Sequence, residues 1–148
     1  MNELAVALKI ALSNSFVMYT KAHSYHWNVE GMFFSQFHEF FGDIYAEVYN
    51  AVDPLAEEMR ALGVYAPISL ADMLSATTVT EDQFKVNGVK DMLVNLQQAN
   101  DQVLESLVKA ADLANNQNLQ GLLNFLADRI DQHKKHAWMI RASLQVGA

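Results

Sequence analysis

The sequence contains no cysteine among its 148 residues. Disulfide bridges, zinc–thiolate sites and thiol nucleophiles are therefore excluded, and the composition suits a reducing compartment. Proline occurs twice and glycine six times, so few residues can interrupt regular structure. Basic residues are also scarce: 10 lysines and arginines face 17 acidic residues, which gives a formal charge of −7. Such a surface repels nucleic acid and anionic membranes and attracts cations.

Long hydrophobic runs are missing as well, although 51% of the residues are hydrophobic. No segment reaches the roughly 18 uninterrupted apolar residues of a membrane span. The first residues, MNELAVALKIALSNS, carry Glu3 and Lys9 within their apolar stretch and lack the basic start of a signal peptide. We therefore expect a soluble, cytoplasmic protein without membrane contact, in which residues 1–148 form a single domain.

Apolar residues recur at intervals of three and four along most of the chain, which is the spacing of amphipathic helices. A first helix is predicted from Asn2, a plausible N-cap, to Gly31, and a second ends before Gly63, where glycine commonly terminates helices. Two further helices follow, separated by the polar residues NNQN at 115–118. No run alternates as a surface strand does, so we predict an all-α protein.

The link between the second and third helices is long. Residues 63–87 lose the helical spacing, contain Pro67 and leave room only for a short helix at 69–74. The other two links are short, and helices joined by a short link are antiparallel neighbours. We therefore predict a ferritin-like four-helix bundle with a long crossover that carries a short helix. Most of the apolar residues, including the phenylalanines, then simply fill its core.

Histidine is concentrated in the stretch HSYHWNVEGMFFSQFHEFF, residues 23–41, which holds three of the five histidines. Di-iron sites in bundle cores use a Glu-x-x-His pair on each of two helices, and this sequence contains no such pair. The nearest acidic candidates are Asp53 and Glu57, which are four residues apart and therefore share one helix face. A metal site of another geometry would have to use these histidines and carboxylates.

His38 and Asp53 belong to the same predicted helix and are fifteen residues apart. At a rise of ~1.5 Å per residue they are separated by about 22 Å, about ten times the length of a metal–ligand bond. One chain cannot bring them to the same ion. Two copies of the helix packed antiparallel around a two-fold axis can, because the beginning of one helix then lies beside the end of the other. The histidines and carboxylates are thus interpreted as halves of an intersubunit site.

The spacing of these residues resembles the signature of the Dps family, the dodecameric mini-ferritins. The signature begins with a His-Trp-Asn-Val motif at residues 26–29. Counted from His26, three more ligand positions follow at intervals of twelve, fifteen and four residues, which are His38, Asp53 and Glu57, and the sequence RALG comes shortly after them. The resemblance covers nearly the whole chain, including the crossover and the last helix with its aromatic residue (HAWMIRASL). It implies a hollow shell of twelve subunits that binds Fe(II) at two-fold interfaces, oxidises it, preferably with hydrogen peroxide, and stores ferric mineral.

Carried over residue by residue, the resemblance assigns four residues as both metal ligands and catalytic residues of a ferroxidase. His26 and His38 would come from one subunit, and Asp53 and Glu57 from its partner. Carboxylate oxygens suit ferric iron and imidazole holds the ferrous form, so iron fits as the cofactor, with hydrogen peroxide or dioxygen as the oxidant. Trp27 would lie close to the iron, where it either intercepts oxidising equivalents or packs the dimer interface. The protein would protect against oxidative damage.

Three features depart from the family pattern. Many members carry an aspartate four residues after His38 that supports a second iron, whereas this chain has Gly42 there and Asp43 next to it. Whether each site binds one iron or two is therefore open. Pro54 disfavours helical geometry at Asp53 and removes one backbone donor, so the second helix is expected to bend there. Family members also line a three-fold pore with aspartates near the start of the last helix. Amides occupy that segment here: Asn115, Asn116, Gln117, Asn118, Gln120 and Asn124. The route of iron uptake is therefore open.

DNA binding depends on phosphate neutralisation, which many family members achieve with lysines on a terminal tail. This chain is predicted to become helical within about three residues, ends in RASLQVGA, and has Lys134-Lys135 as its only adjacent basic pair. DNA binding is therefore not expected. Two rival readings are a DNA-compacting shell with weak ferroxidase activity and a purely structural helical bundle.

The remaining histidines have two interpretations each. His133 and His136 could form a metal pair, but His133 falls on the apolar stripe of the last helix, which favours a buried, hydrogen-bonded histidine. His23 lies one turn before His26. It could orient that ligand, or it could hydrogen-bond at the interface without any metal.

Overall fold

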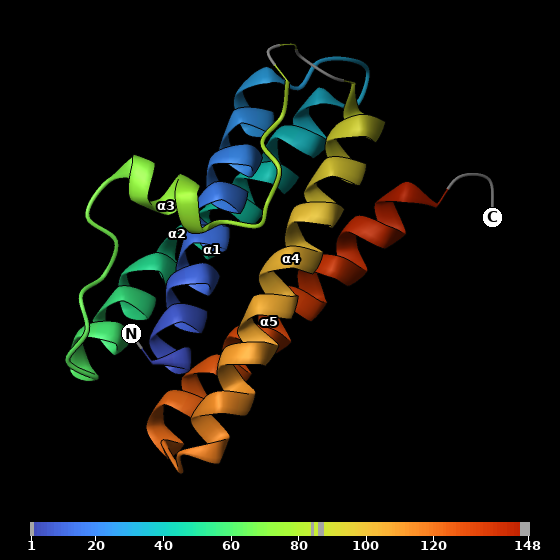
Figure 1. The fold of residues 1–148 in the computed structure, drawn as a ribbon. Coiled ribbons are helices and arrows are strands. Elements are labelled where there is room, and N and C mark those ends of the chain that lie inside the picture. Colours follow the sequence, from blue (N-terminus) through green and yellow to red (C-terminus); the bar gives the residue numbers. More distant parts are fainter. Residues whose placement is uncertain (1, 84, 86–87, 146–148) are drawn as a thin grey trace.

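The computed structural model describes residues 2–83, 85 and 88–145. These residues form four long helices and one short helix (Figure 1), which are α1 (Glu3–Asn28), α2 (Phe34–Ala61), α3 (Leu70–Ala76), α4 (Val89–Asn116) and α5 (Gln120–Leu144). The described part of the chain contains no strand. The all-α prediction and the long crossover with its short helix are confirmed.

The helix ends follow the local signals of the sequence. The Oδ1 atom of Asn2 accepts the backbone N–H of Ala5 at 2.7 Å and caps α1. α2 ends at Ala61, and Gly63 follows with a φ of 85°, a left-handed conformation that glycine adopts without steric cost. Ser69 caps α3 in the same way as Asn2 caps α1. These caps satisfy backbone groups that have no partner within the helix.

α2 continues through Pro54, and Asp53 keeps its helical geometry. The prediction of one second helix that contains Pro54 is confirmed, and the bend expected at the proline stays a prediction. Proline removes one backbone hydrogen bond of the helix. The turn that contains it nevertheless buries Leu55 and Met59 completely in the core, and this burial outweighs the loss of one bond. The candidate ligands on α2 therefore lie on one uninterrupted helix.

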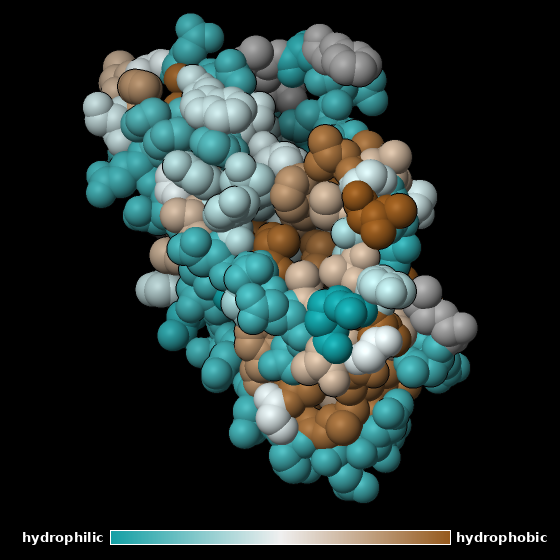
Figure 2. Space-filling view, turned by 90° about the vertical axis from the view of Figure 1, so that its left-hand side faces the viewer, coloured by the Kyte–Doolittle hydropathy of each residue, from teal (hydrophilic) through white to brown (hydrophobic). Residues whose placement is uncertain are grey.

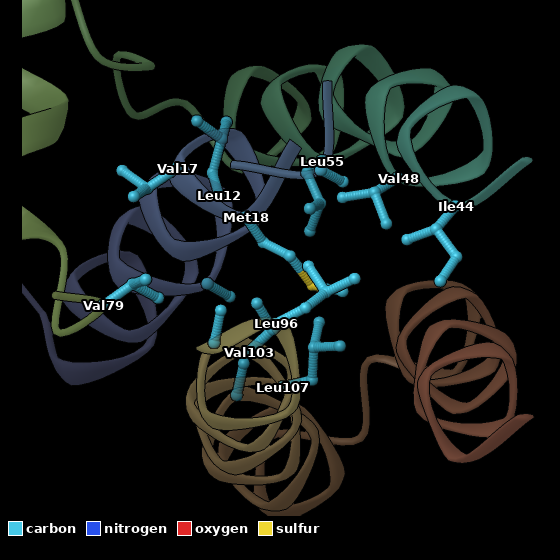
Figure 3. Close-up of a cluster of buried hydrophobic side chains, with 14 of the residues drawn as sticks. Leu12, Val17, Met18, Ile44, Val48, Leu55, Val79, Leu96, Val103 and Leu107 are labelled. Carbon is cyan, nitrogen blue, oxygen red and sulfur yellow. The ribbon is translucent and has the colours of Figure 1, made fainter. Parts of the chain in front are cut away.

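The core lies between the helices. α1 packs against α2 and α4, and α4 packs against α5. Figure 3 shows Met18 of α1, Ile44 and Val48 of α2 and Leu96 and Leu107 of α4 pointing toward one another, and all five are buried. The phenylalanines of the α2 region are less uniform: Phe41 is fully buried, whereas the others lie partly or largely at the surface.

The crossover is attached to the bundle by a buried amide. Asn14, fully buried on α1, accepts the backbone N–H of Thr78 at 2.8 Å and the hydroxyl of Thr77 at 2.6 Å. Its Nδ2 atom donates to the hydroxyl of Thr78 at 3.0 Å and to the carbonyl of Gln102 on α4 at 3.3 Å. One side chain thereby satisfies backbone groups of the crossover and ties it to two helices.

Several large apolar side chains remain at the surface of the isolated chain. The face shown in Figure 2 carries hydrophobic areas in its centre and its lower part, bordered by polar atoms. Among the most exposed are Met32, Ile68, Tyr65 and Trp27, the last at 65%. Contiguous exposed apolar surface commonly marks an interface. No helix in the described part combines the length and the apolarity needed to cross a bilayer.

Candidate metal centre

His26 and His38 hold each other in place through the backbone. Nδ1 of His26 donates to the carbonyl oxygen of His38 at 2.6 Å, and Nδ1 of His38 donates to the carbonyl oxygen of His26, also at 2.6 Å. The two rings stack with their centroids 3.7 Å apart and their planes 18° apart. The carbonyl of His26 lies in the last turn of α1, where carbonyl groups lack helical partners. The pair therefore also joins the end of α1 to the start of α2.

These bonds determine which nitrogen can bind a metal. A carbonyl oxygen only accepts hydrogen bonds, so each Nδ1 atom must carry the proton. In the neutral ring, Nε2 then keeps its lone pair. No side chain in the described ranges hydrogen-bonds the Nε2 atom of either ring. The two rings thus offer two lone-pair nitrogens, held by hydrogen bonds of the kind that orients histidine ligands in metal sites.

Gly42 lies against the His26 ring. A Cβ atom at position 42 would lie 3.0 Å from Nδ1 and 3.2 Å from Cε1 of His26. The His26 ring cannot easily yield, because it is hydrogen-bonded on one side and stacked on His38. The glycine that replaces the aspartate of the family pattern is therefore the residue that leaves room for the imidazole of His26.

Asp53 and Glu57 lie one turn apart on α2, and both are exposed. The hydrogen bond and the negative charge of Asp53 raise the pKa of the Glu57 carboxyl above its usual value. Two carboxylates that repel each other in this way form a local excess of negative charge, which a cation would relieve. Their exposure leaves their oxygen atoms accessible to a ligand or to a second chain.

The histidine pair and the carboxylate pair are far apart within the protomer. His38 and Asp53 lie on the same continuous helix, fifteen residues apart, so about 22 Å of helix rise separates them. Among the described residues, no group of three or more histidines, cysteines or acidic residues is arranged to hold a metal ion. The separation from which a site shared between subunits was predicted is thus present in the structure, while the meeting of the two halves across a subunit interface stays a prediction.

Aromatic rings surround the histidine pair. His23 stacks on Tyr45 with centroids 3.9 Å apart and planes 8° apart, and its Nδ1 atom lies 3.2 Å from the hydroxyl of Tyr19. The centroid of Trp27 lies 4.0 Å from that of His23. His23 therefore bonds to a tyrosine, and no hydrogen bond to His26 is found in the described part of the chain. Spacings of three and four residues along α1 and α2 could have revealed this cluster from sequence.

His133 and His136 belong to a different polar cluster, in the bundle core between α2, α4 and α5. His133 is fully buried, with Nδ1 2.8 Å from Oδ1 of Asn100 and Nε2 2.9 Å from Nη2 of Arg129. Arg129 pairs with both oxygens of Glu47, at 2.5 and 3.1 Å, and Nε2 of His136 lies 2.8 Å from Glu47. The buried, hydrogen-bonded reading of His133 is confirmed.

This cluster changes the ionisation of its members. Burial alone would raise the pKa of Glu47, but hydrogen bonds from His136 and Arg129 outweigh it and lower the value to about 2. Burial, the positive charge of Arg129 and the neighbouring His136 lower the pKa of His133 well below its usual value. The pairing of Glu47 with Arg129 could not be predicted from the sequence, since 82 residues separate them and no local pattern relates them.

The amide residues of the last two helices lie where the sequence placed them, around the joint between α4 and α5. Asn115, Asn118 and Asn124 are exposed, and Asn118 has a φ of 58° in the turn. Lys134 and Lys135 are exposed on α5, and Lys135 lies 3.5 Å from Asp131. Part of the charge of this basic pair is therefore balanced within the helix.

Comparison with known proteins agrees with the fold. The family model of the ferritin-like domain matches residues 5–147. The crystal structure of Dps from Staphylococcus aureus is 28% identical, with a TM-score of 0.91 over 97% of this chain and 96% of that chain. Dps from Vibrio cholerae, described as a member of a broad superfamily of ferritin-like diiron-carboxylate proteins, is 27% identical, with a TM-score of 0.91 over 97% and 89%. DNA protection during starvation protein 2 of Bacillus anthracis is 28% identical over 128 residues, 86% of this chain and 87% of that protein.

The four-helix bundle with its short crossover helix is thus that of a ferritin-like protein. Within that class, the chain belongs to the Dps family of mini-ferritins.

Proposed function

We propose that this mini-ferritin is a ferroxidase that oxidises Fe(II) at intersubunit sites and stores the ferric product inside a dodecamer in the cytoplasm. The observation that carries the proposal is the reciprocal bonding of His26 and His38, which leaves both Nε2 atoms without a hydrogen-bond partner among the described residues. A pair of histidines that served only to join α1 and α2 would not need both Nε2 atoms left without a hydrogen-bond partner in the described part of the chain. The whole chain would act as one ferritin-like domain.

His26 and His38 bind the Fe(II) substrate through Nε2, while their Nδ1 bonds keep the rings oriented. Asp53 and Glu57 of the partner subunit supply the oxygen ligands that stabilise the ferric product. Fe(II) contributes one electron to the oxidant. A site with these four ligands leaves coordination positions for water and hydrogen peroxide, which is why we favour a small oxidant.

One tightly bound iron per site is the stoichiometry that this chain favours. The position that would carry a further carboxylate is Gly42, and a side chain there would collide with the His26 ring. Asp43, the next acidic residue, lies on an exposed part of α2. A second iron would therefore be held more weakly than the first.

Anaerobic titration of the purified oligomer with Fe(II) tests the proposal, because it measures binding without oxidation. We expect saturation near one tight iron per subunit and loss of binding in His26→Ala/His38→Ala. Saturation that is unchanged in that double variant would refute the assignment of these ligands.

Subunit mixing tests the split site. His26→Ala/His38→Ala subunits, co-assembled with Asp53→Ala/Glu57→Ala subunits, should regain part of the activity, because some two-fold interfaces then combine two intact halves. The two parent oligomers serve as controls. If the mixture is no more active than either parent, the ligands are not shared between subunits.

A further inference from the structure

The proposed site raises a question of electron supply, and the inference below rests on that proposed function. Reduction of one hydrogen peroxide molecule to two hydroxide ions consumes two electrons, whereas one Fe(II) supplies one. Because Gly42 leaves no carboxylate for a second tight iron, the second electron must come from a weakly held ion or from the protein. A reduction that stops after one electron releases a hydroxyl radical inside the protein.

Aromatic rings lead away from the site in a continuous series. The ring centroid of His26 lies 5.3 Å from that of Tyr45, which lies 6.1 Å from that of Tyr19. Tyr19 in turn lies 4.7 Å from Tyr49. The series runs between α1 and α2 and begins at a proposed iron ligand, so an electron can pass along it in short steps.

Tyr19 differs from the other tyrosines of this series by its hydrogen bond to a base. A phenol that loses an electron becomes a strong acid, so its oxidation is easy only where a proton acceptor is already bonded to the hydroxyl. Nδ1 of His23 lies 3.2 Å from the hydroxyl of Tyr19. In the described part of the chain, the hydroxyls of Tyr45 and Tyr49 have no such partner. His23 is held in position by its stacking on Tyr45.

Trp27 is the competing donor, since it lies beside His23 with a centroid distance of 4.0 Å. Its indole is 65% exposed, and no base is hydrogen-bonded to it among the described residues. An oxidised Trp27 would have to lose its proton to solvent. The bonded pair of Tyr19 and His23 gives the proton a defined destination within the protein.

We propose that Tyr19, with His23 as its proton acceptor, supplies the second electron for the reduction of hydrogen peroxide. The O–O bond breaks and two hydroxide ions form. One electron comes from Fe(II), which becomes Fe(III), and the other comes from the phenol of Tyr19. The phenolic proton passes to Nδ1 of His23, which leaves a neutral tyrosyl radical and an imidazolium. A later Fe(II) returns the electron, His23 returns the proton, and Tyr19 is restored. Tyr19 thus acts through the ring series as a remote electron donor.

The resting ionisation of the pair suits this role. Burial lowers the pKa of His23, and its Nδ1 atom lies 3.2 Å from the Tyr19 hydroxyl, where it can accept the phenolic proton. Burial and the neighbouring phenols of Tyr49 and Tyr45 raise the pKa of Tyr19, so its hydroxyl keeps the proton until the electron leaves. Both shifts favour the proton on Tyr19 in the resting pair.

The first experiment follows the radical during turnover. Fe(II)-loaded oligomer is mixed with hydrogen peroxide, frozen within milliseconds and examined by electron paramagnetic resonance, while iron oxidation is followed by absorbance. We expect a tyrosyl signal in the native protein and its loss in Tyr19→Phe, which keeps the ring but cannot release a proton. Tyr49→Phe, in the same cluster but without the histidine bond, is the matched control and should keep the signal.

The second experiment contains no metal, so it tests the pair even if the proposed ferroxidase function fails. A flash-generated ruthenium tris-bipyridine oxidant withdraws an electron from the iron-free oligomer, and transient absorbance measures the tyrosyl yield. We expect a lower yield in Tyr19→Phe and in His23→Phe, which keeps an aromatic ring against Tyr45 but has no proton acceptor. The native protein should also show a solvent isotope effect that His23→Phe lacks.

The outcomes separate the two claims. Failure of Fe(II) oxidation would overturn the proposed function and leave the flash experiment to decide on Tyr19. Iron oxidation with an undiminished tyrosyl signal in Tyr19→Phe, a tryptophanyl signal in its place, or an unchanged flash yield in His23→Phe would each overturn the assignment of Tyr19 and His23 as the electron-donating pair.

Discussion

Replacing Gly42 with alanine tests whether the histidine pair is built for metal binding. The added Cβ atom would lie 3.0 Å from Nδ1 of His26, so the ring must shift by a few tenths of an ångström, which strains its hydrogen bond to the carbonyl of His38. That hydrogen bond contributes about 1 kcal/mol to the stability of the fold. Alanine in place of glycine inside a helix stabilises by about the same amount. We therefore expect the free energy of unfolding to change by less than about 1 kcal/mol.

Metal affinity should respond differently. Loss of a hydrogen bond that orients a histidine ligand typically lowers metal affinity about 10- to 100-fold. That range corresponds to about 1.4 to 2.8 kcal/mol of binding free energy. Anaerobic Fe(II) calorimetry and urea unfolding of Gly42→Ala measure the two quantities on the same preparation. The combination of near-native stability with weakened binding is specific to a displaced ligand.

Gly121→Ala is the matched control, since a Cβ atom at that position of α5 meets no atom within 4 Å. It should bind Fe(II) as the native protein does. Gly42→Asp would place a carboxylate at the family position, yet its Cβ atom collides with His26 in the same way. If Gly42→Ala binds Fe(II) with native affinity, or if Gly42→Asp gains a second iron without weakening the first, the role assigned to Gly42 is refuted.

Three further predictions concern stability, oxidant and uptake. Lowering the pKa of Glu47 from 4.5 to about 2 contributes at most about 3 kcal/mol to the free energy of unfolding. This contribution is present above pH 4.5 and is lost as the pH falls toward 2. Urea unfolding of Glu47→Gln should therefore show a lower free energy of unfolding near neutral pH and a weaker dependence of stability on acid pH. Stopped-flow absorbance should show faster Fe(II) oxidation by hydrogen peroxide than by dioxygen, and an equal or faster dioxygen rate would contradict this prediction. Asn124→Asp should raise the initial mineralisation rate at low salt, because a carboxylate attracts cations and salt screens the attraction, while Asn124→Ala should change it little. Abolished uptake in Asn124→Ala would instead identify the amides as a binding relay.

Local patterns were sufficient to predict most of the fold. Apolar spacing identified the four long helices, and the caps at Asn2 and Gly63 lie where the sequence placed them. These signals act over a few residues, and their energies do not depend on distant contacts. At Pro54 the helix continues as predicted, and burial of the neighbouring Leu55 and Met59 in the core offsets the loss of one backbone hydrogen bond.

The relative positions of the candidate ligands on α2 could also be predicted from spacing. Helical geometry places Asp53 and Glu57 on one face and keeps His38 far from both. The tertiary structure alone decided how the histidines are held. The end of α1 has to meet the start of α2 before His26 and His38 can exchange hydrogen bonds, and only that approach brings position 42 against the His26 ring. Contacts of this kind depend on how helices cross, which no single stretch of sequence encodes.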